Sequence, residues 1–370
     1  MEMKVEVKHL LQLMTIPGIG SNRIRNLINH FKETELIFKA TPFELSRVEG
    51  INKTLAKKIF KLREQNSKFV DDQLSKADKL KVKVITFWDD SYPELLRKIY
   101  DPPVILFVRG ELKPEDKFSI AIVGTRTPTN YGKMMCEKFA TELAKMNLTI
   151  VSGFARGIDT IAHLSALKSG GRTIAVLGSG VDYIYPPENR KIVESVLSNG
   201  AIVSEFPMGT KPDAMNFPRR NRIISGMSIG VLVVETSKTG GAMITAEFAN
   251  DQNRDVFAIP GNIDSIKSQG TNFLIKQNKA KLTETVDDII EEIRPLIHPI
   301  LKTEPPKPKV ELNVFEGKIF DVLSPSQPLH VDKIAELSGL SITDTLVHLL
   351  SLEFKDLVIQ LPGKLFVKKI

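Results

Sequence analysis

Six short β-branched runs alternate with helical stretches through the middle of this chain. The runs, within residues 116–290, are FSIAIVGTR, LTIVSGFARG, TIAVLGSG, AIVSEF, IGVLVVETS and DVFAIPG. Most of the stretches between them, such as YGKMMCEKFATELAKM, have apolar residues three or four positions apart, as amphipathic helices do. This alternation predicts an α/β fold with a parallel sheet and helices on both faces. Ligands of such sheets bind at the carboxyl ends of the strands, where these glycine-rich turns would gather.

The chain has 370 residues, more than one hydrophobic core usually organises, which indicates several domains. The proline-rich stretch HPILKTEPPKPKVELN reads as a linker before a last small unit. We therefore predict a helical N-terminal domain, a connector, an α/β core, a linker and a C-terminal domain, at residues 1–65, 66–115, 116–297, 298–312 and 313–370.

The composition is typical of a soluble globular protein, with 42% hydrophobic and 26% charged residues. No apolar run is long enough to span a bilayer, and the opening residues contain no signal-peptide core. We therefore expect a cytoplasmic protein with no membrane partner. The single cysteine, Cys136, has no cysteine partner for a disulfide or a zinc site, which suits a reducing compartment, and we predict no metal site.

The net charge of +7 is compatible with a polyanionic partner. Residues 1–65 hold 12 Lys and Arg against 7 Asp and Glu, whereas residues 311–370 hold 6 against 8. The basic character therefore lies toward the front and the middle of the chain.

Three of the glycine-rich turns carry groups that bind anions. In VGTRTPTNYG, the glycine allows close backbone approach, the threonine offers a hydroxyl, and the arginine supplies a fork that matches phosphate oxygens. In VSGFARGID two glycines bracket an arginine, and in ETSKTGGAMITAE the glycines and a lysine precede a helix whose amides would face an anion. The candidate anion-binding residues of these turns are Gly124, Thr125, Arg126, Gly153, Arg156, Lys238, Thr239 and Gly240.

A fourth basic element is NFPRRNRIISGMS, in which Arg219, Arg220 and Arg222 stand close together before a buried strand. Three guanidinium groups repel one another unless an anion lies among them, and no run of Asp or Glu is nearby in sequence. A single glycine turn is weak evidence, because it could serve chain reversal alone. Three such turns together with these arginines predict a cationic patch that could follow a phosphate backbone.

Motifs of common nucleotide enzymes are absent, since there is no GxxxxGK[ST] and GSGVDY lacks the third glycine of GxGxxG. We therefore expect no cofactor. No paired carboxylates or His–Asp cluster of a hydrolase stand out, so we predict a binding protein with no catalytic residue. A sensor or hydrolase of a nucleotide derivative, using the same glycine-rich turns, is the alternative. The side chains that could serve as acid, base or nucleophile are Glu205, Glu235, Glu247 and His163.

The order of motifs from residue 92 to about 263 resembles the DNA-processing protein A family, DprA or Smf. The motifs are YPELLRKIYDPPVILFVRG, IAIVGTRTPTNYG, VSGFARGIDTIAHLSAL, TIAVLGSGVDYIYPPENRKI, IVSEFPMG, FPRRNRIISGMS, TGGAMITAEFA and VFAIPGNI. The resemblance implies an extended Rossmann-like core. It also implies a protein that binds and protects single-stranded DNA and loads the RecA recombinase onto it in natural transformation, and we expect a homodimer.

The resemblance further assigns residues to DNA binding. The family's strand-binding loops correspond to Gly124, Thr125 and Arg126, to the loop around Arg156, to Arg220, Asn221 and Arg222, and to Lys238 with its neighbours. Thr125 stands where serine is common in the family and keeps the hydroxyl, whereas SKTGG replaces the commoner SGS and leaves the role of Lys238 open. The aromatic residues near these loops, candidates to stack on bases, are Phe154, Phe206, Phe217 and Tyr131.

The N-terminal stretch LLQLMTIPGIGSNRIRNLINHF has the form of a helix-hairpin-helix, as in SAM-like domains. A second copy keeps Gly50 but has Asn52 at its second glycine position. Such hairpins can present backbone amides to a phosphate, and a packing or protein-contact domain is the alternative.

The C-terminal unit reads as three helices followed by a β-hairpin, the pattern of a winged helix-turn-helix. Its predicted recognition helix and the residues after it carry Asp344, Glu353 and Asp356 against Lys355. A helix that enters the major groove needs more positive charge, so a protein-contact or regulatory role is favoured over DNA reading.

Overall fold

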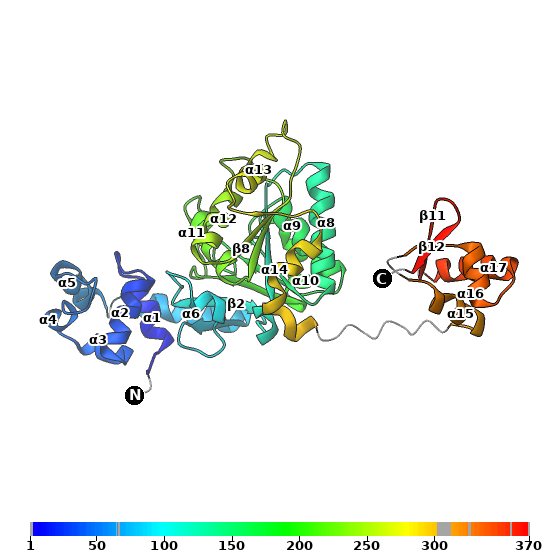
Figure 1. Cartoon of the computed structure of the whole chain (residues 1–370). Helices are drawn as coiled ribbons and strands as arrows, with labels where there is room; N and C mark the ends of the chain where they lie inside the picture. The colour runs from blue at the N-terminus through cyan, green and yellow to red at the C-terminus, as the bar shows by residue number, and fades with distance from the viewer. Residues whose placement is uncertain are drawn as a thin grey trace. The chain divides into compact units, whose positions relative to one another are not determined.

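The computed structural model describes residues 3–63, 65, 67–301, 312–324, 327–355 and 357–368. The chain forms two compact units, Met1–Ile300 and Leu301–Ile370. The larger unit contains the N-terminal helices and the sheet, and the smaller one contains the C-terminal helices and hairpin (Figure 1). None of the described helices is long and apolar enough to cross a membrane.

Nine strands form one sheet in the order β1-β2-β6-β5-β4-β3-β7-β8-β9. Neighbouring strands from β6 to β9 pair in parallel, which confirms the predicted α/β fold. The order of the strands along the chain reverses between β3 and β7, and this is the switch point at which sheets of this kind bind ligands. The predicted β-branched runs form β3 (Ser119–Val123), β4 (Thr149–Ser152), β5 (Thr173–Val176), β6 (Gly200–Ser204), β7 (Gly230–Val233) and β8 (Asp255–Ala258).

Helices cover both faces of this sheet (Figure 1). On one face, α9 (Ile158–Lys168) and α10 (Val193–Ser198) share a hydrophobic core with the sheet, and α8 (Asn130–Lys145) packs along α9. On the other face, α11 (Asn216–Gly226) and α12 (Gly241–Asp251) belong to a second core. The remaining elements of this region are α7 (Glu94–Arg97), α13 (Gln269–Lys276), β9 (Lys281–Leu282), α14 (Val286–Leu301) and the short 3-10 helices Pro114–Lys117 and Pro187–Ile192.

The segment 66–115 differs from the connector that we predicted, because it supplies two strands of the sheet. These are β1 (Val82–Thr86) and β2 (Ile105–Gly110), which pair antiparallel to each other, and β2 pairs antiparallel to β6. Alternate residues of β2 enter the two cores: Phe107 packs in the first and Val108 in the second. A run buried on both faces belongs to the interior of a sheet rather than to a connector.

The N-terminal domain is a tandem of helix-hairpin-helix motifs, as predicted. The first copy pairs α1 (Val7–Met14) with α2 (Ser21–Phe31), and the second pairs α4 (Pro42–Leu45) with α5 (Lys53–Leu62), after the short α3 (Thr34–Lys39). Gly18 and Gly50 take φ values of 95° and 79° at the hairpins, which favours glycine. Arg23 joins the two hairpins, since its guanidinium donates to the carbonyls of both glycines.

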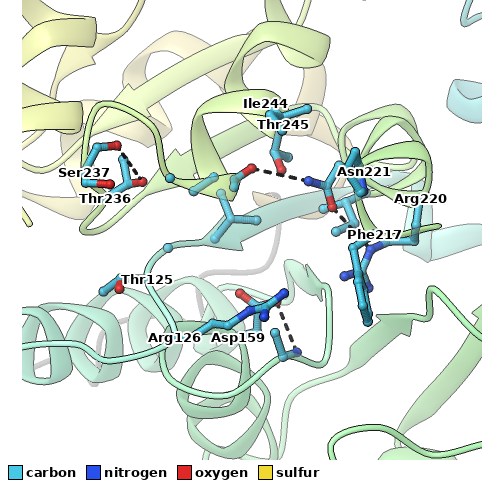
Figure 2. Close-up of a pocket in the computed structure, with 18 of the residues that line it drawn as sticks. Thr125, Arg126, Asp159, Phe217, Arg220, Asn221, Thr236, Ser237, Ile244 and Thr245 are labelled. Carbon is cyan, nitrogen blue, oxygen red and sulfur yellow. Dashed lines mark hydrogen bonds between the residues drawn. The ribbon is translucent and has the colours of Figure 1, made fainter. Parts of the chain in front are cut away.

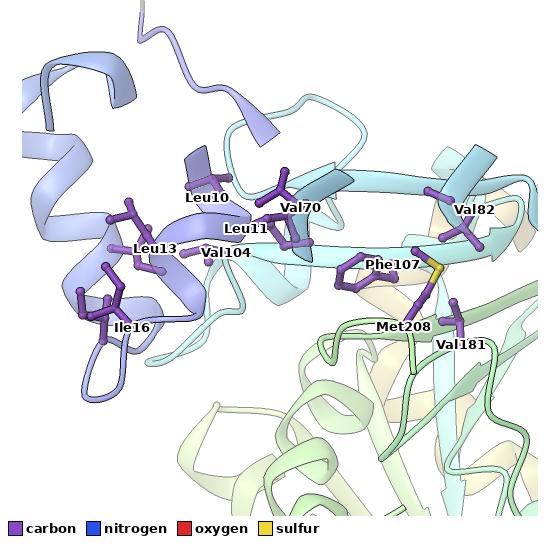
Figure 3. Packing of buried hydrophobic residues seen from close by; sticks show 14 of the residues in the cluster. Leu10, Leu11, Leu13, Ile16, Val70, Val82, Val104, Phe107, Val181 and Met208 are labelled. Carbon is purple, nitrogen blue, oxygen red and sulfur yellow. The ribbon is translucent and has the colours of Figure 1, made fainter. Parts of the chain in front are cut away.

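The hydrophobic core of this tandem continues into the sheet (Figure 3). Leu11 on α1 and Val70 on α6 (Ser67–Leu80) belong to the same core as Phe107 of β2. The Gln73 side chain also exchanges two hydrogen bonds with the Met208 backbone, of 3.0 and 2.8 Å. The tandem is therefore packed against the sheet and shares its core.

The smaller unit is a winged helix, as predicted. Its helices are α15 (Val314–Val322), α16 (Val331–Ser338) and α17 (Ile342–Phe354), and its strands β10 (Leu329–His330), β11 (Val358–Leu361) and β12 (Leu365–Lys368) form an antiparallel sheet in the order β10-β12-β11. Ile319, Leu349 and Phe366 belong to a hydrophobic core of its own. Of the predicted linker 298–312, residues 298–301 end α14 and 302–311 lie outside the described residues, as does Asp356.

Candidate functional site

A cavity of about 830 Å³ opens at the carboxyl ends of β3 and β7, where the strand order reverses. Figure 2 shows its walls, which come from the turn after β3, the start of α9, helix α11 and the turn between β7 and α12. The structure thus brings together segments that are far apart in the sequence, from Val123 to Lys267. The predicted residues that line this cavity are Gly124, Thr125, Arg126, Arg220, Asn221 and Gly240.

The turn after β3 holds an exposed cation at the cavity. Gly124 is needed there, because a Cβ at this position would lie 2.6 Å from Ile158 Cγ1 and 2.9 Å from the Glu235 carbonyl oxygen. The amide of Thr125 donates to that carbonyl at 2.7 Å, which fixes the turn. Arg126 follows in an exposed position, with its guanidinium 5.5 Å from the centre of the Phe217 ring.

The N-terminus of α12 forms a second wall. Its N-cap, Gly240, makes no side-chain capping bond, and the helix runs for 11 residues, so the first backbone amides carry the positive end of a helix dipole. Gly240, Gly241 and Ala242 all line the cavity. The Asn221 side chain donates to the Gly241 carbonyl at 3.3 Å and joins α11 to this turn. Backbone amides at a helix start are a common binding site for phosphate.

Arg220 supplies a buried cation on the third wall. Only 3% of it is exposed, and its guanidinium donates to the main-chain carbonyls of Gly153 and Val176. Burial lowers the pKa of Arg220 to about 10, which still leaves the side chain charged at neutral pH. Burial likewise raises the pKa of Asp159, and the charge of Arg220 opposes that rise.

Gly153 has a packing role beside this pair. A Cβ at Gly153 would lie 2.6 Å from Asp159 Oδ2 and 2.7 Å from Arg220 Nη2. The absence of a side chain therefore lets the carboxylate and the guanidinium approach the backbone. Gly153 lines a small recess next to the main cavity together with Arg126 and Arg156.

The structure does not bring Arg222 to the cavity. Its side chain is 8% exposed, and Nη2 lies 2.5 Å from Glu205 Oε2 in a buried ion pair. Asp101 lies 3.8 Å from its Nε. The anion that balances Arg222 is thus a carboxylate at the end of β6, which tertiary folding brings to α11 although it is 17 residues away in sequence.

Four other predicted residues lie at the margin of the cavity or beyond it. Arg156 is exposed and pairs with Glu188 at 2.7 Å. Arg219 is exposed and stands 5.8 Å from the Phe206 ring centre. Lys238 and Thr239 are exposed in the turn before α12, between the lining residues Ser237 and Gly240. These side chains can reach a ligand that extends beyond the cavity, but they do not form its walls.

Sequence reasoning missed part of the lining. Lys267, in the segment after β8, closes one side and donates to the Thr127 carbonyl. Tyr185 also lines the cavity, and its ring centre lies 5.9 Å from that of Phe217. The segment with Lys267 carries neither a glycine-rich turn directly before a helix nor clustered arginines, so the pattern gave no signal for it. Tyr185 stands in the quoted motif TIAVLGSGVDYIYPPENRKI and could have been found there.

Of the four aromatic candidates, only Phe217 lines the cavity. Phe154 is fully buried, and Phe206 is 8% exposed behind Arg219. Tyr131 is partly exposed and donates its hydroxyl to the Pro260 carbonyl at 2.8 Å. One of the four predicted rings therefore lies in the cavity.

None of the four acid–base candidates lines the cavity. Glu235 is 2% exposed and accepts hydrogen bonds from the backbone and hydroxyl of Thr129 at the start of α8. His163 is fully buried against Thr173, and burial lowers its pKa to about 3, so it is neutral. Glu247 is exposed on α12, and Glu205 pairs with Arg222. Within the described parts of the chain, no three His, Cys, Asp or Glu side chains group closely enough to hold a metal ion.

Sequence profiles of known families match all three parts of the chain. The profile described as DNA recombination-mediator protein A matches residues 83–294, the DprA winged helix domain matches 303–364, and a SAM-like helix-hairpin-helix tandem matches 10–61. These matches and the fold define a DNA recombination-mediator protein. The protein Smf of Synechocystis is 35% identical over 98% of this chain and 99% of its own length. The chain belongs to the DNA-processing protein A family, which is also called DprA or Smf.

Two solved structures share this fold. The DprA of Streptococcus pneumoniae superposes with a TM-score of 0.68 at 33% identity, covering 78% of this chain and 99% of its own. The DprA of Helicobacter pylori, whose structure is titled for a unique single-stranded DNA binding mode, has a TM-score of 0.53 at 30% identity, covering 58% of this chain and 97% of its own.

Proposed function

We propose that the protein binds single-stranded DNA in the cavity at the ends of β3 and β7. The observation that carries the proposal is the convergence of positive groups on one cavity: the exposed Arg126, the buried Arg220, Lys267 and the amides at the start of α12. Asp159 is the one carboxylate among the described lining residues. Such a site attracts phosphate oxygens and holds them by charge and by hydrogen bonds.

Phe217 supports single strands over duplex as the ligand. Its ring lies inside the cavity next to the Arg126 guanidinium, so it offers a flat apolar surface beside a cation. Bases of a single strand are free to stack on such a ring, whereas bases of a duplex are already stacked on one another. The Helicobacter relative, named for its single-stranded DNA binding mode, supports the same ligand.

In the cell, the protein would protect incoming or processed single strands and load RecA onto them during natural transformation and recombination. The description of the matched family as recombination mediators supports this role. We propose that it acts in the cytoplasm as a homodimer and as a binding protein without catalytic chemistry. The RecA role is tested by following RecA-dependent ATP hydrolysis on single strands covered by a single-strand-binding protein. Addition of this protein should shorten the lag, and an unchanged lag would refute loading.

A nucleotide-derivative sensor or hydrolase is the second candidate. The volume of about 830 Å³ lies within the range of small-molecule sites, roughly 300–1,000 Å³, and favours this candidate over a purely structural role. The two candidates predict different ligands for one and the same cavity.

Parallel titrations separate them. A fluorescent single-stranded oligonucleotide, the matching duplex, and a panel of free nucleotides are titrated in parallel at several salt concentrations. The proposal expects the single strand to bind more tightly than the duplex, with an affinity that falls steeply with salt. Saturable binding or turnover of a free nucleotide together with no binding of the oligonucleotide would support the sensor or hydrolase instead.

A further inference from the structure

Helix α17 of the winged helix carries an apolar stripe on its exposed side. Its other side packs inward, where Leu349 and Leu352 are buried in the domain core. On the exposed side, positions 342, 346, 350 and 354 repeat every four residues and so follow one ridge of the helix. The exposed fractions of the side chains that form this α17 stripe are Ile342 52%, Leu346 40%, Val347 60%, Leu350 54% and Phe354 84%.

The stripe continues onto α15. Phe315 is 48% exposed and stacks on His348 of α17, with ring centres 5.4 Å apart and planes at 17°. Val314, the first residue of α15, is 74% exposed. With side chains of about 150–200 Å² each, the stripe and these two residues present roughly 700 Å² of apolar surface. A soluble monomer seldom exposes a patch of more than about 300–600 Å², and larger ones mark interaction sites.

DNA is not a suitable occupant for this surface. In a winged helix that reads DNA, this helix would enter the major groove and contact phosphates with Lys and Arg. Helix α17 contains neither residue type, and its acidic residues are Asp344 and Glu353. The helix would therefore meet the phosphates with negative charge and with apolar side chains.

A second copy of the chain fits the surface. The stripe is centred near Val347 and Leu350, so two copies of α17 laid antiparallel would place these residues about a twofold axis and bury each stripe against itself. No charged side chain stands between Asp344 and Glu353, so the centre of such a contact buries no like charges. In this register Glu353 of one helix stands level with Asp344 of the other, at the two ends of the contact and outside its apolar centre.

The size of the surface agrees with this occupant. A stable interface buries about 800 Å² on each partner, close to the area of the exposed patch. We propose that the winged helix associates with that of a second chain through the α17 stripe. This contact is independent of the DNA-binding cavity, so it does not rest on the proposed function.

Cross-linking of the full chain tests the contact directly. Cys136 is fully buried, so a cysteine placed by Val347→Cys is the one that a short bismaleimide reaches. The proposal expects a covalent dimer from this variant. The matched control is Lys364→Cys, an exposed position at the tip of the β11–β12 hairpin, which should yield little dimer. Equal yields from the two variants would overturn the proposal, whatever other contacts the full chain makes.

Sedimentation of the winged helix provides the second measurement, since this unit has its own core and is compact by itself. The unit should show a concentration-dependent monomer–dimer equilibrium. Val347→Glu with Leu350→Glu should weaken the association by about 100-fold or more, because the dimer would bury unpaired carboxylates. Circular dichroism checks that this double variant is folded. If it is not folded, the cross-linking of Val347→Cys remains the test of the contact. A wild-type unit that stays monomeric would overturn the proposal. So would a stripe that binds another protein but does not associate with a second copy of itself.

Discussion

Arg222 Nη2 lies 2.5 Å from Glu205 Oε2, and both side chains are more than nine-tenths buried. The pair connects α11, which also carries Arg220, to the end of β6. Burial raises the pKa of Glu205, and the charge of Arg222 opposes that rise. Two arginines that are nearly adjacent in sequence therefore do different work, since one lines the cavity and the other holds two elements of the fold together.

Arg222→Ala should lower the free energy of unfolding without changing how the affinity for DNA depends on salt. The substitution leaves the Glu205 carboxylate buried without its partner, a change that typically costs about 3–5 kcal/mol of the free energy of unfolding. Urea unfolding measures that loss, and titration at several salt concentrations measures the slope. The double variant Arg222→Met with Glu205→Met is the control and should recover much of the stability. An Arg222→Ala protein of wild-type stability with a flatter salt slope would contradict this assignment.

Arg126→Ala should have the opposite effect, because this guanidinium is exposed at the cavity. We expect unchanged thermal stability and a salt slope for a single strand that is smaller by about 0.7, the contribution of one phosphate contact. The loss of affinity should be similar for all base sequences, since phosphates carry no base information. Lys145→Ala, at an exposed lysine on the last turn of α8, is the control for a general change in charge. If both variants flatten the slope equally, Arg126 has no specific contact.

Phe217→Ala should weaken single-strand binding by about 1–3 kcal/mol through the loss of base stacking. Its salt slope should stay that of the wild type, because the ring carries no charge. Phe217→Tyr keeps the aromatic face and should retain most of the affinity. Equilibrium titration of all three proteins with one oligonucleotide makes the comparison, and an alanine variant as tight as the tyrosine variant would rule out stacking at this ring.

His163 should make the fold sensitive to acid. Burial lowers its pKa from 6.5 to about 3 in the folded protein, so between these values the unfolded chain binds a proton that the folded chain does not. Its contribution to stability is therefore complete above pH 6.5 and is lost as the pH falls toward 3. Between pH 6.5 and 5 the loss should be about 2 kcal/mol.

His163→Asn isolates this effect, because the asparagine amide can still donate to the Thr173 hydroxyl, which lies 2.6 Å from His163 Nδ1. Urea unfolding of both proteins at pH 7 and pH 5 gives the comparison. The variant should lose about 2 kcal/mol less on acidification than the wild type does. Equal losses in the two proteins would show that His163 does not resist protonation in the fold.

Removal of the winged helix should leave DNA binding intact. A chain of residues 1–300 keeps the whole sheet and the cavity, so its single-strand affinity should stay within about twofold of the full chain. A fragment of residues 116–290 lacks β1 and β2 and would expose the edge of β6, so it should be poorly soluble. Gel-shift titration and gel filtration make these tests. A large loss of affinity in a well-folded 1–300 chain would place part of the binding site in the winged helix.

The parallel strands could be predicted because each is a compact β-branched run with a turn after it. β1 and β2 also contain apolar runs, but nothing local indicates that β2 would pair with β6 rather than lie outside the core. Such pairing depends on segments far apart in the chain, which periodicity does not reveal. The motif patterns at the two ends were enough to predict the helix-hairpin-helix and the winged helix, because each has its own local pattern of helices and turns.

The candidate site shows a similar limit. The sequence around Pro218 shows arginines clustered before a strand, but proline is tolerated in the first turn of a helix, and the arginines lie on α11, which begins at Asn216. Successive helical residues point about 100° apart, so Arg220 and Arg222 cannot face the same ligand. Had the helix been recognised in the sequence, Arg220 and Arg222 would have been assigned to different faces of it. The partner of Arg222 could not have been found this way, because Glu205 meets it only through the fold.

The placement of β2 has a consequence for the order in which the protein forms on the ribosome. Phe107 of β2 pairs with Ser204 of β6. Because β6 comes much later in the sequence, β2 leaves the ribosome long before its partner strand does. During that interval the helix-hairpin-helix tandem and the β1–β2 pair can assemble, but one edge of β2 has no neighbour. An open edge of this kind invites pairing with other nascent chains. Slow translation between β2 and β6 should therefore increase aggregation, whereas a pause after β6 should have little effect.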